Sequence, residues 1–225
     1  MTNRLLAVAN LIKSHNHQVS VIDVGSDHAY LSIYLVENGL ADRVTNIEVN
    51  ELPLKNGYEN VQKHNLLDKI DFVLNDGFKN LDLKRAIDYV TISGMGATSI
   101  MNIVENNLHQ VPQYYIVQPN NDVHKLRSFL KNHNYIIDNE EIIYDAGLHY
   151  EILKFHKADT TNILDDVDLF VGPVNKVSLT EVKKAYFLQR IKGIERFDLE
   201  KISSQLKQEY LVMKEFLEDE KNWTC

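Results

Sequence analysis

The sequence is poor in cysteine, because its only cysteine is Cys225. One thiol forms neither an intrachain disulfide nor a cysteine-based metal site, so the chain is typical of a reducing compartment and we expect a cytoplasmic protein. The histidines have no metal-binding pattern either. His15 and His17 lie in an expected loop, and His149 and His156 flank a strand without matching acidic partners. We therefore expect no metal.

Long apolar runs are also absent. The first apolar stretch, Leu5 to Ile12, is too short to span a bilayer and has no small-residue cleavage site, which argues against a membrane segment and a secretory signal. Within it Leu5, Val8, Leu11 and Ile12 recur with a helical period and predict a packed helix. The 225 residues are 44% hydrophobic, enough for one core and a small appended domain.

The phosphate-binding fingerprint GxGxxG is missing as well. Residues 21–30 read VIDVGSDHAY, a strand that runs into a single glycine turn and then a helix. Gly25 allows close backbone approach to a ligand, but Asp23 and Asp27 would repel a pyrophosphate. An adenosine ligand with an ammonium and a sulfonium at its other end suits these carboxylates better, and S-adenosylmethionine is such a ligand.

Strand-like and helix-like stretches alternate up to residue 157, which predicts an α/β, Rossmann-like, mostly parallel sheet. Five parallel strands are expected, at 19–24, 44–49, 70–74, 89–93 and 114–117, with helices at 28–38, 54–65, 97–107 and 122–131. Two further strands, at 135–144 and 150–155, are separated only by the turn-like DAGLH and predict a terminal antiparallel hairpin. The expected sheet therefore has seven strands.

The chain is expected to divide into residues 1–157, a ligand-binding domain, and residues 158–225, a C-terminal helical extension. Ser178 and Glu181 have the spacing of a capping box at a helix start. The apolar register slips between Ile194 and Leu199, where Asp198 could cap a second helix. This slip favours an antiparallel, coiled-coil-like pair of helices over one continuous rod.

Candidate ligand-binding residues follow the expected parallel strands. Ligands of open α/β sheets bind beyond the carboxyl ends of the strands, where these residues would gather. Glu48 could accept both ribose hydroxyls, and Asp76 could accept from the exocyclic amine of adenine. Each residue alone could be a plain turn or a solvated strand end, but their joint placement favours a cofactor site made of Asp23, Gly25, His28, Glu48, Val49, Asp76, Gly77, Gly94 and Met95.

Several motifs resemble those of the bacterial tRNA (adenine-22-N1)-methyltransferases, class I enzymes that use S-adenosylmethionine. They are DVGSDHAYLSIYLVENG, ISGMGATSI, QPNNDVHKLRSFL, NYIIDNEEIIYDAGLHYEI and VGP, in that order. The resemblance covers nearly the whole chain. Two departures are mild: Ala97 stands where the family usually has glycine, and Ile47 is bulkier than the family's small residue before Glu48.

The resemblance implies a class I methyltransferase fold and methyl transfer to N1 of adenine 22 in tRNA, with S-adenosylhomocysteine as the other product. Adenine N1 carries no proton at neutral pH, so positioning and electrostatics matter more than a general base. We expect Asp27 and Asn120 to stabilise the charge on the base and Tyr30 to stack on it. For Asp27 a plain helix N-cap is the alternative, and for His28 helix capping or packing.

The C-terminal extension has two interpretations. Net charge is −8, yet basic residues cluster there, so an RNA-binding arm would use Lys183, Lys184, Arg190, Lys192 and Arg196 on phosphates. The alternative is a dimer contact with solvated charges. A small-molecule methyltransferase with a dimerisation tail and a non-enzymatic RNA-binding module are the rival functions. We expect tRNA as partner, no membrane, and no obligate protein partner.

Overall fold

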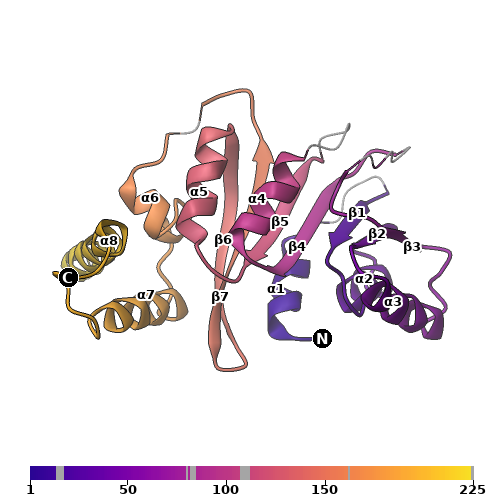
Figure 1. The fold of residues 1–225 in the computed structure, drawn as a ribbon, viewed down its shortest axis with the longest axis horizontal. Helices are drawn as coiled ribbons and strands as arrows, with labels where there is room; N and C mark the ends of the chain where they lie inside the picture. The colour runs from indigo at the N-terminus through magenta and orange to yellow at the C-terminus, as the bar shows by residue number, and fades with distance from the viewer. Residues whose placement is uncertain (14–17, 80, 82–84, 107–111, 162, 224–225) are drawn as a thin grey trace.

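The computed structural model describes residues 1–225 except 14–17, 80, 82–84, 107–111, 162 and 224–225. Its centre is a seven-stranded sheet in the order β3-β2-β1-β4-β5-β7-β6 (Figure 1). The strands are β1 (Ser20–Val24), β2 (Arg43–Glu48), β3 (Ile70–Leu74), β4 (Tyr89–Met95), β5 (Tyr114–Pro119), β6 (Tyr135–Asp145) and β7 (Leu148–Lys157). The predicted seven-stranded Rossmann-like sheet is confirmed.

β1 to β5 pair in parallel, and β7 is antiparallel to both β5 and β6. The predicted terminal hairpin is therefore confirmed. β6 runs in the direction of β5, so the hairpin tip between Asp145 and Leu148 lies at the carboxyl ends of the parallel strands. Figure 1 shows the hairpin projecting beyond the rest of the sheet.

Helices cover the sheet. They are α1 (Asn3–Asn10), α2 (Tyr30–Glu37), α3 (Glu51–Lys63), α4 (Ala97–Glu105), α5 (Val123–Asn132), α6 (Asp166–Phe170), the 3-10 helix η1 (Asn175–Val177), α7 (Glu181–Ile194) and α8 (Ser204–Trp223). The predicted packed N-terminal helix is confirmed as α1. None of the helices among these described residues is long and apolar enough to cross a membrane.

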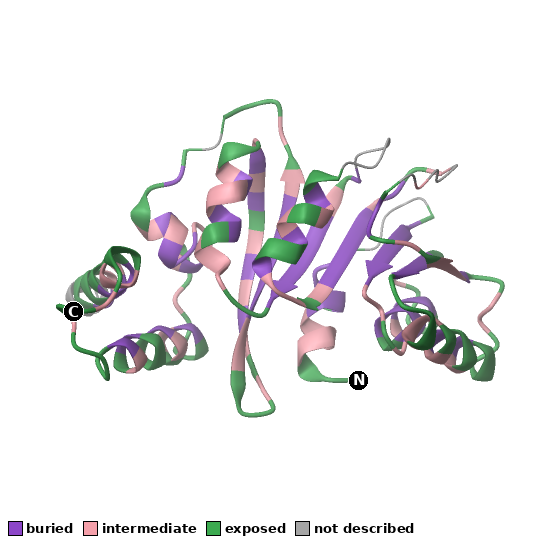
Figure 2. Ribbon diagram, viewed as in Figure 1, coloured by how far each residue is buried: buried purple, intermediate pink, exposed green. Residues whose placement is uncertain are grey.

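Helices cover the sheet on both faces, and successive side chains of each strand point to opposite faces. Neighbouring residues of one strand therefore belong to different buried clusters. Ile22 belongs to a buried cluster with residues of α4 and α5, such as Leu126. Its neighbour Val21 packs instead with the α1–α3 side, where Val8 and Val61 lie. Figure 2 shows the central strands buried along most of their length.

The C-terminal extension forms two helices, α7 and α8, as the register slip predicts. They contact each other through Arg190 with Glu209 and Phe187 with Phe216, so they run in opposite directions along their contact. A third buried cluster joins α6, α7 and α8 to Ile142 of β6. The extension therefore has its own small core and packs on the edge of the sheet.

One helix start differs from the prediction. The cap of α7 is Thr180, whose hydroxyl accepts the Lys183 backbone N–H at 3.3 Å. The capping box predicted from Ser178 and Glu181 is therefore wrong, because Glu181 is the first residue of the helix instead of its third.

Candidate functional site

A cavity of about 470 Å³ lies at the carboxyl ends of β1 to β4, where the sequence places a ligand site. Its volume is in the range of small-molecule sites. Part of its wall comes from α4, through side chains such as Ser99 and Asn102. It brings together six of the predicted cofactor residues: Gly25, Glu48, Val49, Asp76, Gly77 and Met95.

Gly25 forms the tightest turn of this cavity. Its φ is +74°, a left-handed conformation that favours glycine, and an added Cβ would overlap the Met95 side chain. Its N–H donates to the Ile47 carbonyl at 2.9 Å, which fixes the turn against β2. A backbone without side chain at this point leaves a cradle for a ligand, as an S-adenosylmethionine site requires.

Glu48, at the end of β2, lies on the cavity wall and is only 7% exposed. One carboxylate oxygen accepts the Asp27 N–H at 2.5 Å. Burial raises the pKa of Glu48, and the hydrogen bond from the Asp27 backbone opposes that shift. The Glu48 carboxylate fits the implied cofactor, because a carboxylate at this strand end accepts hydrogen bonds from ribose hydroxyls.

Asp23 does not line the cavity. It is buried within β1, where it accepts the Thr91 hydroxyl at 2.6 Å and lies 3.5 Å from the Ser32 hydroxyl. Burial raises the pKa of Asp23 to about 6, with a smaller contribution from the nearby charge of Glu48. Its predicted role at the methionine end of a ligand stays a prediction, since its side-chain hydrogen bonds are with Thr91 and Ser32, neither of which lines the cavity.

Asp27 and His28 on the β1–α2 loop form a group with Tyr30, the first residue of α2; Asp27 and Tyr30 are exposed and His28 is half-buried. His28 Nε2 lies 3.6 Å from Asp27 Oδ2, and the His28 and Tyr30 rings are 5.3 Å apart. Asp27 and Ala29 both have positive φ, so the helix begins at Tyr30 and not at His28 as predicted. Asp27 is not the N-cap of α2, so that alternative is wrong.

The end of β5 and the residues after it hold the end of β4 and the start of α4. Asn120 Nδ2 donates to the Gly94 carbonyl at 2.7 Å, and Gln118 Oε1 accepts the Gly94 N–H at 3.1 Å. Asn121 Oδ1 accepts the Ala97 N–H at 3.2 Å and so caps α4. Asn120 Oδ1 also accepts from Gln118 Nε2 at 3.2 Å. Both the nitrogen and the oxygen of the Asn120 amide are thus hydrogen-bonded, to Gly94 and to Gln118, although the residue is exposed.

Arg4 lies beside the end of β4, a placement that the sequence did not reveal. Its guanidinium lies over the Tyr150 ring, 5.1 Å from the centroid, and Nη1 is 3.9 Å from the Cβ position of Gly94. Its backbone N–H donates to Asp145 at the hairpin tip, at 3.1 Å. A cation is thereby held beside the β4 loop. In sequence Arg4 only precedes an apolar helix, so no local signal points to it.

The predicted RNA-binding residues have unequal surroundings. Lys183 is only 4% exposed, so its placement among the phosphate-contacting residues is wrong; it lies on the inner face of α7. Arg190 is paired with Glu209, with Nε 3.0 Å from Oε1. Lys184 is half-buried, and Lys192 and Arg196 are exposed. Lys192 on α7 and Arg196 just past its end therefore offer exposed cationic surface.

The geometry supports an adenosine-type ligand. Among the residues that the structure describes, no three histidine, cysteine, aspartate or glutamate side chains are grouped to hold a metal ion.

The chain matches the family model of tRNA (adenine(22)-N(1))-methyltransferase over residues 21–222. It is 30% identical to the tRNA (adenine(22)-N(1))-methyltransferase of Bacillus subtilis strain 168 over 192 residues, 84% of this chain and 79% of that protein.

Solved structures agree with this match. A Streptococcus pneumoniae protein in complex with S-adenosyl-L-methionine is 31% identical, with a TM-score of 0.87 over 96% of this chain and 99% of that chain. M. capricolum TrmK, in complex with S-adenosyl-homocysteine, is 27% identical, with a TM-score of 0.83 over 97% of this chain and 98% of that chain. Both comparisons extend through the helical extension as well as the sheet.

Proposed function

The chain belongs to the tRNA (adenine(22)-N(1))-methyltransferase family, and we propose below how its own residues carry out that reaction. The enzyme transfers the methyl group of S-adenosylmethionine to N1 of adenine 22 in tRNA. The observation that carries this function is the match over residues 21–222, with the strand-end cavity in the matched region. It supports tRNA over the small-molecule acceptor and over a non-enzymatic RNA-binding module.

The cofactor would lie along the carboxyl ends of β1 to β4. Glu48 keeps one carboxylate oxygen for the ribose hydroxyls while the other holds the Asp27 N–H. Asp76 and Gly77 would hold the adenine, with Val49 against its face. Gly25 and Met95 would surround the methionine part, with Gly94 next to Met95 but outside the cavity lining. His28 would close the loop side through its contact with Tyr30.

Arg4 completes this arrangement. The cofactor's methionine end carries a carboxylate, and the predicted cofactor set contains no permanently cationic residue to balance it. Arg4 holds its guanidinium beside Gly94 and is kept there by Tyr150 and Asp145. A guanidinium binds a carboxylate through two parallel hydrogen bonds. We therefore assign Arg4 to the methionine carboxylate.

When bound, the cofactor supplies a sulfonium methyl, which the N1 lone pair attacks as the carbon–sulfur bond breaks and its electrons return to sulfur. N1 loses no proton, so the protein needs no general base there. The adenine ring becomes positively charged, and the exposed carboxylate of Asp27 can stabilise that charge. Tyr30, beside it, offers an exposed ring on which an extruded base can stack.

In this proposal the main role of Asn120 is to position Gly94. Both ends of its amide are bonded within the loops after β4 and β5, so it fixes the carbonyl of Gly94 beside the methyl-transfer site. Its expected contact with the charged base would use the remaining lone pair of Oδ1. A rigid loop matters here because N1, methyl carbon and sulfur must align.

We propose that residues 1–157 bind the cofactor and the target base and that residues 158–225 contribute tRNA contacts. Lys192 on the outer face of α7 and Arg196 just past its end are the primary phosphate contacts; Lys184 adds a further contact, and Arg190 is paired with Glu209. The protein acts in the cytoplasm in this proposal and needs neither a membrane nor an obligate protein partner.

The test is direct. The protein is incubated with S-adenosylmethionine and unmodified tRNA, and methylated nucleosides are mapped by mass spectrometry. We expect 1-methyladenosine at position 22 alone, and a large loss of rate with Asp27→Ala at unchanged cofactor affinity. Cofactor binding without any tRNA methylation would contradict the proposal and restore the small-molecule acceptor.

A further inference from the structure

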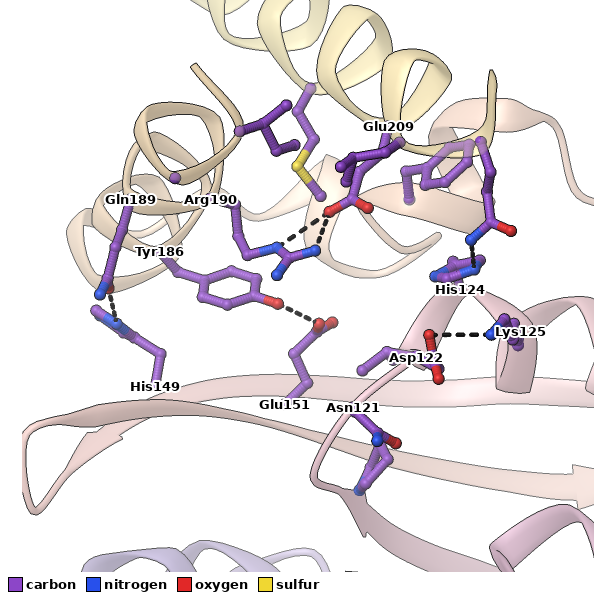
Figure 3. A pocket seen from close by; sticks show the side chains of 18 of the residues that line it. Asn121, Asp122, His124, Lys125, His149, Glu151, Tyr186, Gln189, Arg190 and Glu209 are labelled. Atoms are coloured by element: carbon purple, nitrogen blue, oxygen red, sulfur yellow. Dashed lines mark hydrogen bonds and ion pairs between the residues drawn. The ribbon is translucent and has the colours of Figure 1, made fainter. Parts of the chain in front are cut away.

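A second and larger cavity, of about 790 Å³, lies between the edge of the sheet and the two C-terminal helices. We call it the α7–α8 cavity. One wall comes from β7 and the start of α5, the other from α7 and α8 (Figure 3). Asn120 and Asn121 belong to its lining, and the same two residues hold Gly94 and Ala97. The cavity therefore borders the loop at which methyl transfer is proposed.

The charged groups in the α7–α8 cavity are already paired. Arg190 is bonded to Glu209, and Lys125 Nζ lies 3.2 Å from Asp122 Oδ1. The Tyr186 hydroxyl donates to Glu151 at 2.6 Å. A phosphate inside would meet carboxylates as well as cations, so the interior does not suit a phosphate.

Most of the remaining polar groups are amides and imidazoles; the Ser203 hydroxyl accepts the Leu206 N–H at 3.2 Å. His149 Nδ1 donates to Gln189 Oε1 at 2.8 Å, and Gln205 hydrogen-bonds His124 Nε2, so both pairs link the sheet side to the helices (Figure 3). Burial lowers the pKa of His124, which keeps its imidazole neutral and able to accept. His124 also stacks on Phe170, with ring centroids 5.6 Å apart.

Neutral amide and imidazole groups beside aromatic rings are the chemistry that recognises an unstacked nucleobase. Glutamine and asparagine amides match the donor and acceptor pattern of base edges, and flat rings stack on base faces. The volume exceeds that of one base, which leaves room for its sugar. Extruding the target adenosine also unstacks its neighbours in the chain, so an adjacent base becomes available.

Resting on the proposed tRNA function, we propose that the α7–α8 cavity binds the base of a nucleotide adjacent to the methylated adenosine, between Gln189 and Gln205. The phosphate of that nucleotide would remain outside. Lys192 is exposed on α7, three residues beyond the cavity-lining Gln189, and Arg196 is exposed just past the end of α7, next to the cavity-lining Phe197, so both lie at its rim. The cavity would then bind the base of this nucleotide, and the cations at the rim of the cavity would bind its phosphate.

The experiment uses the full chain and three tRNAs: an unaltered tRNA and two in which the nucleotide on one or the other side of the target adenosine lacks its base. Dissociation constants are measured for the natural protein and for Gln189→Leu, a substitution of similar size that removes the amide. Gln208→Leu is the matched control, because Gln208 bridges to Asp166 at 2.8 Å outside the cavity.

We expect one of the two abasic tRNAs to bind the natural protein about tenfold more weakly than unaltered tRNA, the loss expected of one stacked base. Gln189→Leu should bind unaltered tRNA more weakly and discriminate less than twofold, whereas Gln208→Leu should retain the full difference. A purely structural Gln189 would weaken all three tRNAs equally, and that result overturns the inference.

Equal binding of all three tRNAs by the natural protein also overturns it. Methylation of the unaltered tRNA is measured with the same preparations. If the natural protein methylates that tRNA but does not discriminate the abasic ones, only this inference fails. If it does not methylate the unaltered tRNA, the proposed function itself fails.

Discussion

The carboxylate of Glu48 accepts the backbone N–H of Asp27 at 2.5 Å, so the end of β2 holds the loop that carries the proposed catalytic aspartate. The same carboxylate lies on the wall of the cofactor cavity. The Glu48 side chain therefore has two roles in this proposal: it fixes the backbone of the Asp27 loop, and it is positioned to bind the ribose of the cofactor. Loss of this contact should affect cofactor affinity and catalysis together.

Glu48→Gln and Glu48→Ala test this relationship. Glutamine keeps an oxygen that can accept the Asp27 N–H but loses the charge that strengthens the ribose hydrogen bonds. We expect cofactor affinity to fall about tenfold for Gln and about a hundredfold for Ala, from the strength of hydrogen bonds to charged groups. Calorimetric titration measures the affinity and saturating kinetics the rate; a lower kcat for Ala than for Gln is expected. Unchanged affinity in both variants would contradict the ribose assignment.

Stability should depend on pH through Asp23. Its pKa is about 6 in the folded protein against 3.8 for the unfolded group, so the folded state holds the proton more tightly. Unfolding free energy should therefore decrease as pH rises from about 4 to 6, by at most about 3 kcal/mol, and should stay lowered above that range.

Asp23→Asn should reduce this slope and stabilise the protein above pH 6, because the amide oxygen can still accept the Thr91 hydroxyl. Urea unfolding at several pH values measures the effect. Asp27→Asn, which changes an exposed carboxylate on the adjoining loop, is the control and should keep the slope. Burial also raises the pKa of Glu48, so a smaller slope of the same sign should remain; an undiminished slope in Asp23→Asn would assign the pH dependence to another group.

The sheet was predictable because its evidence is local and repeated. Apolar strands such as Tyr114 to Val117 alternate with helical stretches, and hydrophobic period alone distinguishes them. The start of α2 was not predictable, because the left-handed conformations of Asp27 and Ala29 depend on contacts with Glu48 and α3. Propensity assigns neither residue to that conformation.

Arg4 and Lys183 show the same limit at the site. Arg4 reaches Gly94 through tertiary packing of α1 beside the hairpin, about 90 positions away along the chain, and no spacing rule connects them. Lys183 lies in a basic run, yet helical geometry turns it inward. A run of charge indicates a cationic segment, but only the packed helix decides which members face solvent.

Arg4 is predicted to bind the cofactor carboxylate. Arg4→Gln should weaken S-adenosylmethionine binding about tenfold, in proportion to the loss of one charge-assisted pair. The decarboxylated cofactor should bind the natural protein and Arg4→Gln with equal affinity, because the group that Arg4 recognises is missing. Calorimetry on both ligands checks this. If the variant loses tRNA affinity and keeps cofactor affinity, Arg4 contacts a tRNA phosphate instead.

A buried charge cluster should make the junction between sheet and extension sensitive to mutation. Arg127 donates to Glu140 at 2.7 Å and to Glu151 at 2.5 Å, and Glu140 in turn accepts the Val174 N–H at 3.0 Å. Arg127→Met would leave two buried carboxylates unpaired and should cost about 3–5 kcal/mol of stability, measured by urea unfolding. The triple variant Arg127→Met/Glu140→Gln/Glu151→Gln should regain part of the stability that Arg127→Met loses. A triple variant less stable than Arg127→Met would contradict the argument from buried charge.

The outer face of α7 is predicted to set the salt dependence of tRNA binding. Lys192 and Arg196 are exposed, whereas Lys183 is buried in the same helix. Each phosphate contact releases counterions, so the double charge reversal Lys192→Glu/Arg196→Glu should reduce the slope of log affinity against log salt by about 1–2 and weaken binding at low salt. Lys183→Met should leave the slope unchanged, because Lys183 is buried. Filter binding at four salt concentrations measures both. If Lys183→Met flattened the slope while the double reversal did not, the inner face of α7 would be the RNA contact, and the arrangement of α7 and α8 described above would have to open for tRNA to bind.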